Sequence, residues 1–179
     1  MSDIQTTGTS LAVHTTVNAP ARTVFDVLAD PTTHARIDGT GWVREPVDGA
    51  RLTGAGQIFR MGMYHENHPH RHYEIANRVE VFDPPHAIAW QPGAEPRHIP
   101  GRGADATGPV EFGGWIWRYD LAPQHAPGAP AGTRVTLTYD WSQVPAADRR
   151  AMRFPPFPPE HLVNSLRHLK ELAERDVPR

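Results

Sequence analysis

The stretch that decides the fold is RHYEIANRVEVF, residues 71–82, because apolar and polar side chains alternate along it. One face of this segment carries Tyr73, Ile75, Asn77, Val79 and Val81. The opposite face is mostly charged or polar. An alternation with a period of two is typical of a half-buried strand. Residues 71–82 are therefore predicted to form a strand, and Asn77 is the exception on its otherwise apolar face.

Six further segments on either side of this strand have the same character. They span residues 10–17, 41–47, 56–65, 87–91, 114–121 and 133–141. Turn-forming sequences such as Asp48-Gly49 separate them. Between the first two strands, residues 20–28 and 32–37 are predicted to form two short helices, because Asp30-Pro31 interrupts an otherwise apolar stripe.

The last segment, EHLVNSLRHLKELAER at residues 160–175, changes the apolar period from two to 3.6. Its apolar stripe consists of Leu162, Val163, Leu166, Leu169, Leu172 and Ala173. At 1.5 Å per residue this helix is about 24 Å long, enough to cross the concave face of a twisted sheet. The order of elements predicts an α+β fold in which a long C-terminal helix covers one face of an antiparallel sheet.

Composition restricts the classes of function. The 179 residues predict one domain, with a core over about residues 10–175. The net charge of −2, without runs of like charge, argues against a nucleic-acid partner. Without a long apolar stretch or a signal-peptide pattern, we expect no stable membrane insertion and a cytoplasmic location. The absence of cysteine excludes thiolate chemistry and cysteine-based zinc sites.

Short segments along almost the whole chain resemble a known superfamily. Those that carry the resemblance are APARTVFDVLADP (19–31), FRMGM (59–63), NRVEVF (77–82), IAW (88–90), WRYDL (117–121) and GTRV (132–135). Together with the order of elements they resemble the START-like/SRPBCC superfamily, also called helix-grip or Bet v 1-like, and within it the polyketide cyclase/dehydrase and lipid transport type. The resemblance implies a seven-stranded antiparallel sheet wrapped around the C-terminal helix, with a cavity between them. It also implies a bacterial cyclase or a lipid carrier.

Three irregular segments occupy alternate connections of the predicted sheet: His65–Arg71, Pro92–Phe112 and Ser142–Pro159. Alternate connections of an antiparallel meander emerge at the same end. We therefore expect these segments to share one rim, which would be the mouth of a pocket.

Strand parity predicts the lining of that pocket. One strand directs Phe59, Met61, Met63 and His65 inward, and its neighbour directs Tyr73, Ile75 and Asn77. Trp90, Trp117, Tyr119, Tyr139 and Trp141 could form an aromatic wall for a flat ligand, or pack as ordinary core residues. A buried amide without a partner costs about 1–3 kcal/mol, so Asn77 needs either a structural hydrogen bond or a ligand.

The sequence has no nucleophile motif, phosphate-binding loop or dinucleotide fingerprint, so we expect no cofactor. By the resemblance, a cyclisation or dehydration would use His65 or Tyr73 as acid or base, and Asn77 to polarise a carbonyl. The alternative is a non-catalytic carrier or sensor of a lipid or hydrophobic metabolite. Arg60 and Arg118 are expected to face solvent, and Asp38 to serve a turn.

The His-rich run HENHPHRH, residues 65–72, allows three interpretations: a metal site, an acid or base at the pocket rim, or a solvated turn. Pro69 breaks the helix that a helical two-histidine motif would need. We therefore predict no tightly bound metal. The sequence leaves homodimerisation open.

Overall fold

The computed structural model describes residues 4–125 and 131–175 as an α+β fold. Its strands are β1 (Ile4–Thr6), β2 (Ser10–Val17), β3 (Val43–Pro46), β4 (Ile58–Tyr64), β5 (His72–Asp83), β6 (Ala87–Ala94), β7 (Glu111–Phe112), β8 (Ile116–Gln124) and β9 (Gly132–Asp140). The helices are α1 (Ala21–Leu28), α2 (His34–Ile37), α3 (Ala146–Ala151) and α4 (Glu160–Arg175), with 3-10 turns η1 (Pro31–Thr33) and η2 (Pro96–His98).

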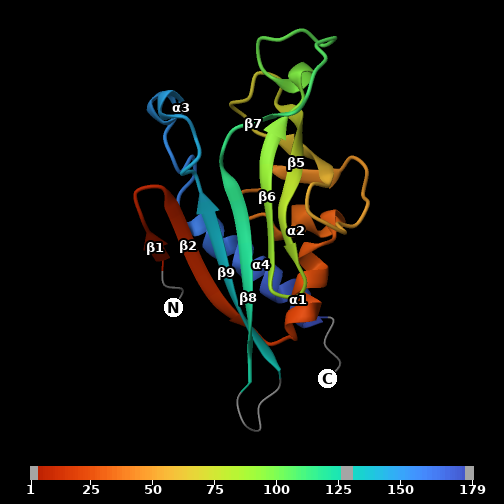
Figure 1. Cartoon of the computed structure of the whole chain (residues 1–179), viewed down its shortest axis with the longest axis vertical. Helices are drawn as coiled ribbons and strands as arrows, with labels where there is room; N and C mark the ends of the chain where they lie inside the picture. The colour runs from red at the N-terminus through yellow and green to blue at the C-terminus, as the bar shows by residue number, and fades with distance from the viewer. Residues whose placement is uncertain (1–3, 126–130, 176–179) are drawn as a thin grey trace.

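All strands join one antiparallel sheet in the order β1-β2-β9-β8-β6-β5-β4-β3, with β7 paired to β6 (Figure 1). Each of the seven predicted strands corresponds to an observed strand. The sheet also gains β1 and β7, which were not predicted because segments of three and two residues carry no readable alternation. The α+β helix-grip fold is confirmed, with a sheet larger than seven strands.

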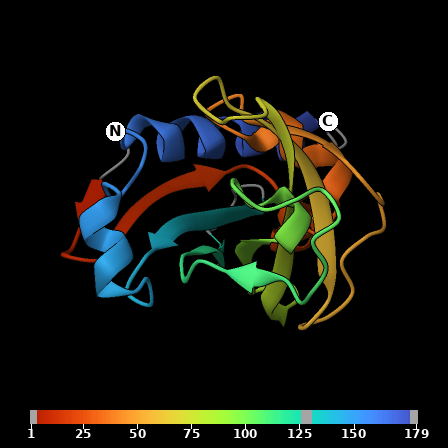
Figure 2. The ribbon, with the colours of Figure 1, turned by 90° about the horizontal axis from the view of Figure 1, so that it is seen from above.

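The long helix α4 spans the predicted residues and crosses the face around which the sheet curves (Figure 2). Its buried side chains Leu162, Leu166 and Leu169 are at most 1% exposed. Burial of this stripe is the main reason why a segment with many charged residues is held against the sheet. Within the described residues, no helix is both long and apolar enough to cross a membrane.

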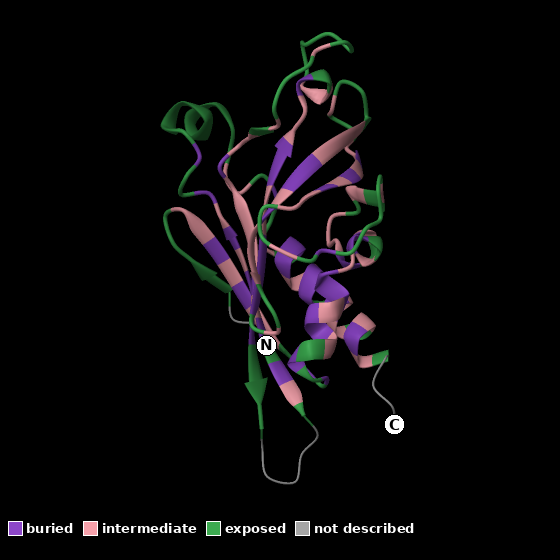
Figure 3. Cartoon of the chain, turned by 45° about the vertical axis from the view of Figure 1, so that its right-hand side comes forward, coloured by how far each residue is buried: buried purple, intermediate pink, exposed green. Residues whose placement is uncertain are grey.

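Buried and partly buried residues alternate along β4, whereas α3 is exposed throughout (Figure 3). The turn between β4 and β5, the loop that contains η2, and α3 lie at the same end of the sheet (Figure 1). His98 Nε2 lies 3.3 Å from Glu74 Oε2, which joins the η2 loop to the beginning of β5. The predicted common rim is therefore present.

Candidate functional site

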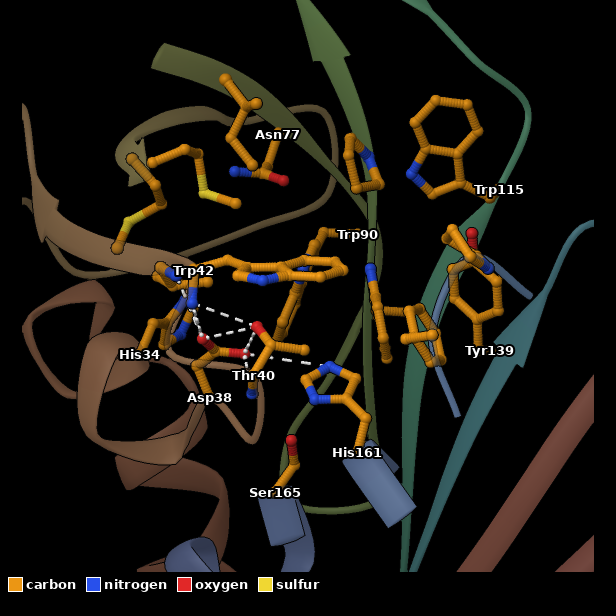
Figure 4. A pocket seen from close by; sticks show the side chains of 18 of the residues that line it. His34, Asp38, Thr40, Trp42, Asn77, Trp90, Trp115, Tyr139, His161 and Ser165 are labelled. Atoms are coloured by element: carbon orange, nitrogen blue, oxygen red, sulfur yellow. Dashed lines mark hydrogen bonds and ion pairs between the residues drawn. The ribbon is translucent and has the colours of Figure 1, made fainter. Parts of the chain in front are cut away.

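A cavity of about 370 Å³ lies between α4 and the sheet (Figure 4). Its walls come from α2, β4, β5, β6, β8, β9, the α2–β3 connection, residues 152–157 and α4. The volume falls within the range of about 300–1,000 Å³ that is usual for small-molecule pockets. The sheet supplies a mostly apolar wall, and the region of α2 and α4 supplies most of the polar groups.

All but one of the residues predicted from strand parity line this cavity: Phe59, Met61, Met63, Tyr73, Ile75 and Asn77. The aromatic residues Trp90, Trp117, Tyr119 and Tyr139, for which core packing was the alternative, line it as well. The pairing of β4 with β5 explains the agreement, because Phe59 lies opposite Asn77, and Met63 opposite Tyr73, in a regular ladder. In such a ladder, cross-strand partners point to the same face.

His65 is the exception, since it is not among the residues that line the cavity. Strand β4 ends at Tyr64, so the parity of the strand no longer fixes the direction of the next side chain. Instead, His65 Nδ1 accepts a hydrogen bond from Asn67 N at 3.1 Å, and its ring packs against Trp42. The structure therefore does not bring His65 into the cavity lining with Tyr73 and Asn77, contrary to the strand-parity prediction.

Aromatic rings build one wall of the cavity. Trp90 stacks on His34 with ring centroids 4.9 Å apart, and Trp117 lies 4.6 Å from Tyr139. Phe157, from the segment before α4, stacks on Trp117 at 5.4 Å. Trp141 belongs to the core beside Tyr139 and does not line the cavity. These flat surfaces suit a flat apolar ligand.

Asn77 lines the cavity from β5 with only 2% of its surface exposed. Its amide makes no hydrogen bond within residues 4–125 and 131–175, and its polar atoms are not among the fully buried ones without a partner, which agrees with an amide that faces the cavity. Opposite it on β6 stands Pro92, which has no N–H to donate. The amide is therefore free to donate to, or accept from, a molecule in the cavity.

Tyr73 lines the same side of the cavity and stacks on His68, with centroids 3.9 Å apart. Burial raises the pKa of its phenol. The phenol is therefore a neutral hydrogen-bond donor at neutral pH. Burial also raises the pKa values of Tyr119 and Tyr139, which stay neutral for the same reason.

Asp38 lies in the turn after α2 and also lines the cavity. The sequence indicated only its role in the turn. Its carboxylate accepts hydrogen bonds from the backbone N–H groups of Trp42 at 2.7 Å, Val43 at 3.0 Å and Thr40 at 3.2 Å. The Thr40 hydroxyl donates to the same carboxylate at 3.0 Å. The turn after α2 thus fixes an oriented carboxylate under the aromatic wall.

His161, in the first turn of α4, faces this carboxylate (Figure 4). Its Nε2 lies 3.8 Å from Asp38 Oδ1, an ion-pair distance when the imidazole is protonated. Its Nδ1 lies beside the Gly39 backbone but has no hydrogen bond of normal geometry among the described residues. Burial lowers the pKa of His161, and the charge of Asp38 opposes that shift. The imidazole is therefore neutral near pH 7.

Gly39 permits this arrangement. A Cβ atom at this position would lie 2.3 Å from the His161 carbonyl oxygen and 2.9 Å from Nδ1. Such contacts are much closer than van der Waals separation, so α4 can approach the turn only where residue 39 has no side chain.

His34 is a second buried imidazole of the cavity. Its Nε2 donates to the Leu28 carbonyl oxygen at 2.8 Å. Burial lowers the pKa of His34, so the ring is neutral near pH 7. Because Nε2 is committed to a backbone acceptor, this ring is held in place by the fold.

Sequence reasoning missed His161 and Ser165. Their spacing of four residues places both on one side of α4, next to the apolar stripe, and this was the available signal. Asp38 and His161 are far apart in the sequence, and only the packing of α4 on the α2–β3 connection brings them together. No group of three or more His, Asp or Glu in the described residues has metal-binding geometry, and the absence of a bound metal remains a prediction.

Comparisons with known proteins agree with the fold and leave the activity open. No family model matches the sequence. The uncharacterized protein Rv0088 of Mycobacterium tuberculosis is 27% identical over 125 residues, which are 70% of this chain and 44% of that protein. The chain therefore spans less than half the length of this relative.

Solved bacterial structures have the same helix-and-antiparallel-sheet fold. Protein Ms6760 from Mycobacterium smegmatis has a TM-score of 0.62 and 16% identity over 98% of both chains. Protein NE0264 from Nitrosomonas europaea has a TM-score of 0.63 and 13% identity, over 96% of this chain and 98% of that one. At such identities the likeness establishes the fold alone.

Proposed function

We propose that this protein binds a small hydrophobic or aromatic oxygenated molecule in the cavity beneath α4. We propose further that it acts on this molecule without a cofactor, as a cyclase or dehydratase of the polyketide cyclase/dehydrase type of the SRPBCC superfamily. The observation that carries the proposal is the Asn77 amide, 2% exposed and without a hydrogen-bond partner in the described residues, in a cavity walled by aromatic rings. A carbonyl or hydroxyl oxygen of a ligand would satisfy that amide.

The helix-grip fold and the polar groups at both sides of the cavity support the enzymatic version. Asn77 lies on one side, and His161 and Ser165 lie on the other (Figure 4). A ligand with an apolar body and oxygen atoms at separated positions would meet polar groups at each. A non-catalytic carrier or sensor is the second candidate, and the largely apolar lining from β4, β5 and β6 favours it.

The binding proposal can be tested by tryptophan fluorescence with naphthoquinone, a flat aromatic molecule with two carbonyl oxygens. Trp42, Trp90, Trp115 and Trp117 line the cavity and would report its occupancy. We expect saturable quenching by wild-type protein. Asn77→Leu should weaken binding by about 3- to 10-fold, since one net hydrogen bond contributes about 0.5–1.5 kcal/mol.

The matched control is Asn67→Leu, which changes an exposed asparagine in the β4–β5 turn. It should bind naphthoquinone as the wild type does. Quenching that does not saturate, or an unchanged dissociation constant in Asn77→Leu, would contradict the proposed role of the cavity.

A further inference from the structure

The pair formed by His161 and Asp38 is a buried polar feature that packing alone does not explain. His161 is 7% exposed and is surrounded by the rings of Phe157 at 4.7 Å, Trp117 at 5.6 Å and Trp42 at 6.3 Å. Its Nδ1 lies beside the Gly39 backbone, which favours the protonated ring, but makes no hydrogen bond of normal geometry among the described residues. Buried polar atoms of this kind are rare, and they are often found at functional sites.

The carboxylate of Asp38 is positioned to stabilise a positive charge on that ring. Hydrogen bonds from the Thr40, Trp42 and Val43 backbone fix its orientation, and its Oδ1 lies 3.8 Å from His161 Nε2. Both side chains are largely buried, so an anion at this distance favours the imidazolium that forms when the ring takes a proton.

We propose that His161 is a general base that removes a proton from an apolar, aromatic or carbonyl-bearing ligand in the cavity. Asp38 positions the imidazole and stabilises its protonated form. The proposal rests on the proposed function, because the ligand must first occupy the cavity. A ligand oxygen bound by Asn77 would leave a different part of the same molecule near His161, since the two residues lie on opposite sides of the cavity (Figure 4).

The other titratable groups that line the cavity are His34, Tyr73, Tyr119, Tyr139 and Arg153. The three phenols have raised pKa values and are neutral. His34 already donates Nε2–H to the Leu28 carbonyl oxygen. Arg153 is exposed at the rim. Of the two histidines that line the cavity, His161 is the one whose Nε2 lies within ion-pair distance of a carboxylate, that of Asp38.

The test uses nitrobenzisoxazole, a flat aromatic carbon acid with a coloured product. The base is His161 Nε2, since Nδ1 is buried against Gly39, and it removes the proton on the carbon of the isoxazole ring. The electron pair of that C–H bond then forms a C≡N bond, the N–O bond breaks, and the oxygen leaves as a phenolate. The imidazolium later returns its proton to solvent. The reaction needs no oxidant, metal or second substrate.

Wild-type protein should catalyse this elimination with saturation. The pH profile of kcat should rise to a plateau with a midpoint below 6.5, the ordinary value for histidine, because burial lowers the pKa of His161. His161→Gln should lower kcat by about 100-fold or more, as expected for loss of a general base. His86→Gln, an exposed histidine in the β5–β6 turn, should leave kcat unchanged.

Asp38→Asn should lower the kcat plateau, leave KM nearly unchanged and shift the midpoint to lower pH, because the imidazolium loses its anion. Circular dichroism establishes that this variant is folded. If it does not fold, two other results decide the matter: an unchanged midpoint and plateau in His161→Gln would indicate another base, and a wild-type rate that rises into alkaline solution without a plateau would indicate hydroxide. Either result would overturn the role of His161.

Binding is measured separately with nitroindazole, which has a similar shape but no N–O bond to break. Tryptophan quenching by nitroindazole in both wild type and His161→Gln, with equal elimination rates, would overturn the general base and leave the binding function intact. No quenching in wild type would contradict the binding function, and the general base with it. Quenching in both proteins, with elimination lost only in His161→Gln, is the expected result.

Discussion

His34 and His161 are buried imidazoles whose pKa values lie below the ordinary value for histidine, in both cases chiefly because burial disfavours the charged form. The unfolded chain therefore takes up protons at these residues at a higher pH than the folded protein. Because the two states bind different numbers of protons, the free energy of unfolding depends on pH. Well above pH 6.5, the ordinary pKa of histidine in an unfolded chain, both states are neutral at these positions and the dependence vanishes.

We predict that the free energy of unfolding falls as the pH is lowered from about 7 to 5. Each of the two histidines can contribute at most about 1.4 kcal/mol per pH unit. Urea denaturation at several pH values measures the slope, which should be smaller in His161→Gln and unchanged in His86→Gln. A wild-type stability that is flat or rises toward pH 5 would contradict neutral buried imidazoles.

Among single residues, Asn77 could be identified from the sequence because it was the one polar side chain on an apolar strand face. Asp38 could be identified only in part. Its position before Gly39 indicated a turn, but nothing local indicated that α4 would bring an imidazole to the same carboxylate. His161 lies beside a leucine stripe, and its environment is decided by residues from the α2–β3 connection, β8 and the segment before α4.

At the scale of elements, α4 and the strands follow from the period of their apolar residues. The helix spans the predicted Glu160–Arg175, and β2 spans the predicted Ser10–Val17. The edge strands β1 and β7 depend on pairing with β2 and β6, so their own sequences did not reveal them. The end of β4 also explains why the prediction for His65 failed. This residue follows the last position of the strand, so strand parity no longer fixes the direction of its side chain.

Leu166 tests the packing of α4 on the sheet. This side chain is 1% exposed, and Leu166→Ala should lower the free energy of unfolding by about 2–5 kcal/mol through lost contacts and a residual cavity. Leu172→Ala, at a partly buried position of the same helix, should cost less. Urea denaturation measures both. Equal effects at the two positions would contradict the assigned buried face of α4.

At the scale of the whole molecule, the cavity results from a curved sheet that α4 covers without filling. The three irregular connections lie at the same end of the sheet, as the antiparallel order predicted. The regular pairing of β4 with β5 made much of the lining predictable. The opposite wall, which α2, α4 and residues 152–157 build, depends on tertiary packing and could not be derived from local periodicity.

Native mass spectrometry tests the central claim, that this cavity holds a small organic molecule, most directly. Wild-type protein and two variants are each incubated with an organic extract of bacterial cells. Ser165→Trp places a large ring in the cavity from α4, and Ser142→Trp is the control at an exposed position. We predict a bound small molecule on wild type and Ser142→Trp, and none on Ser165→Trp. The same bound molecules on all three proteins, or none on wild type, would contradict the account.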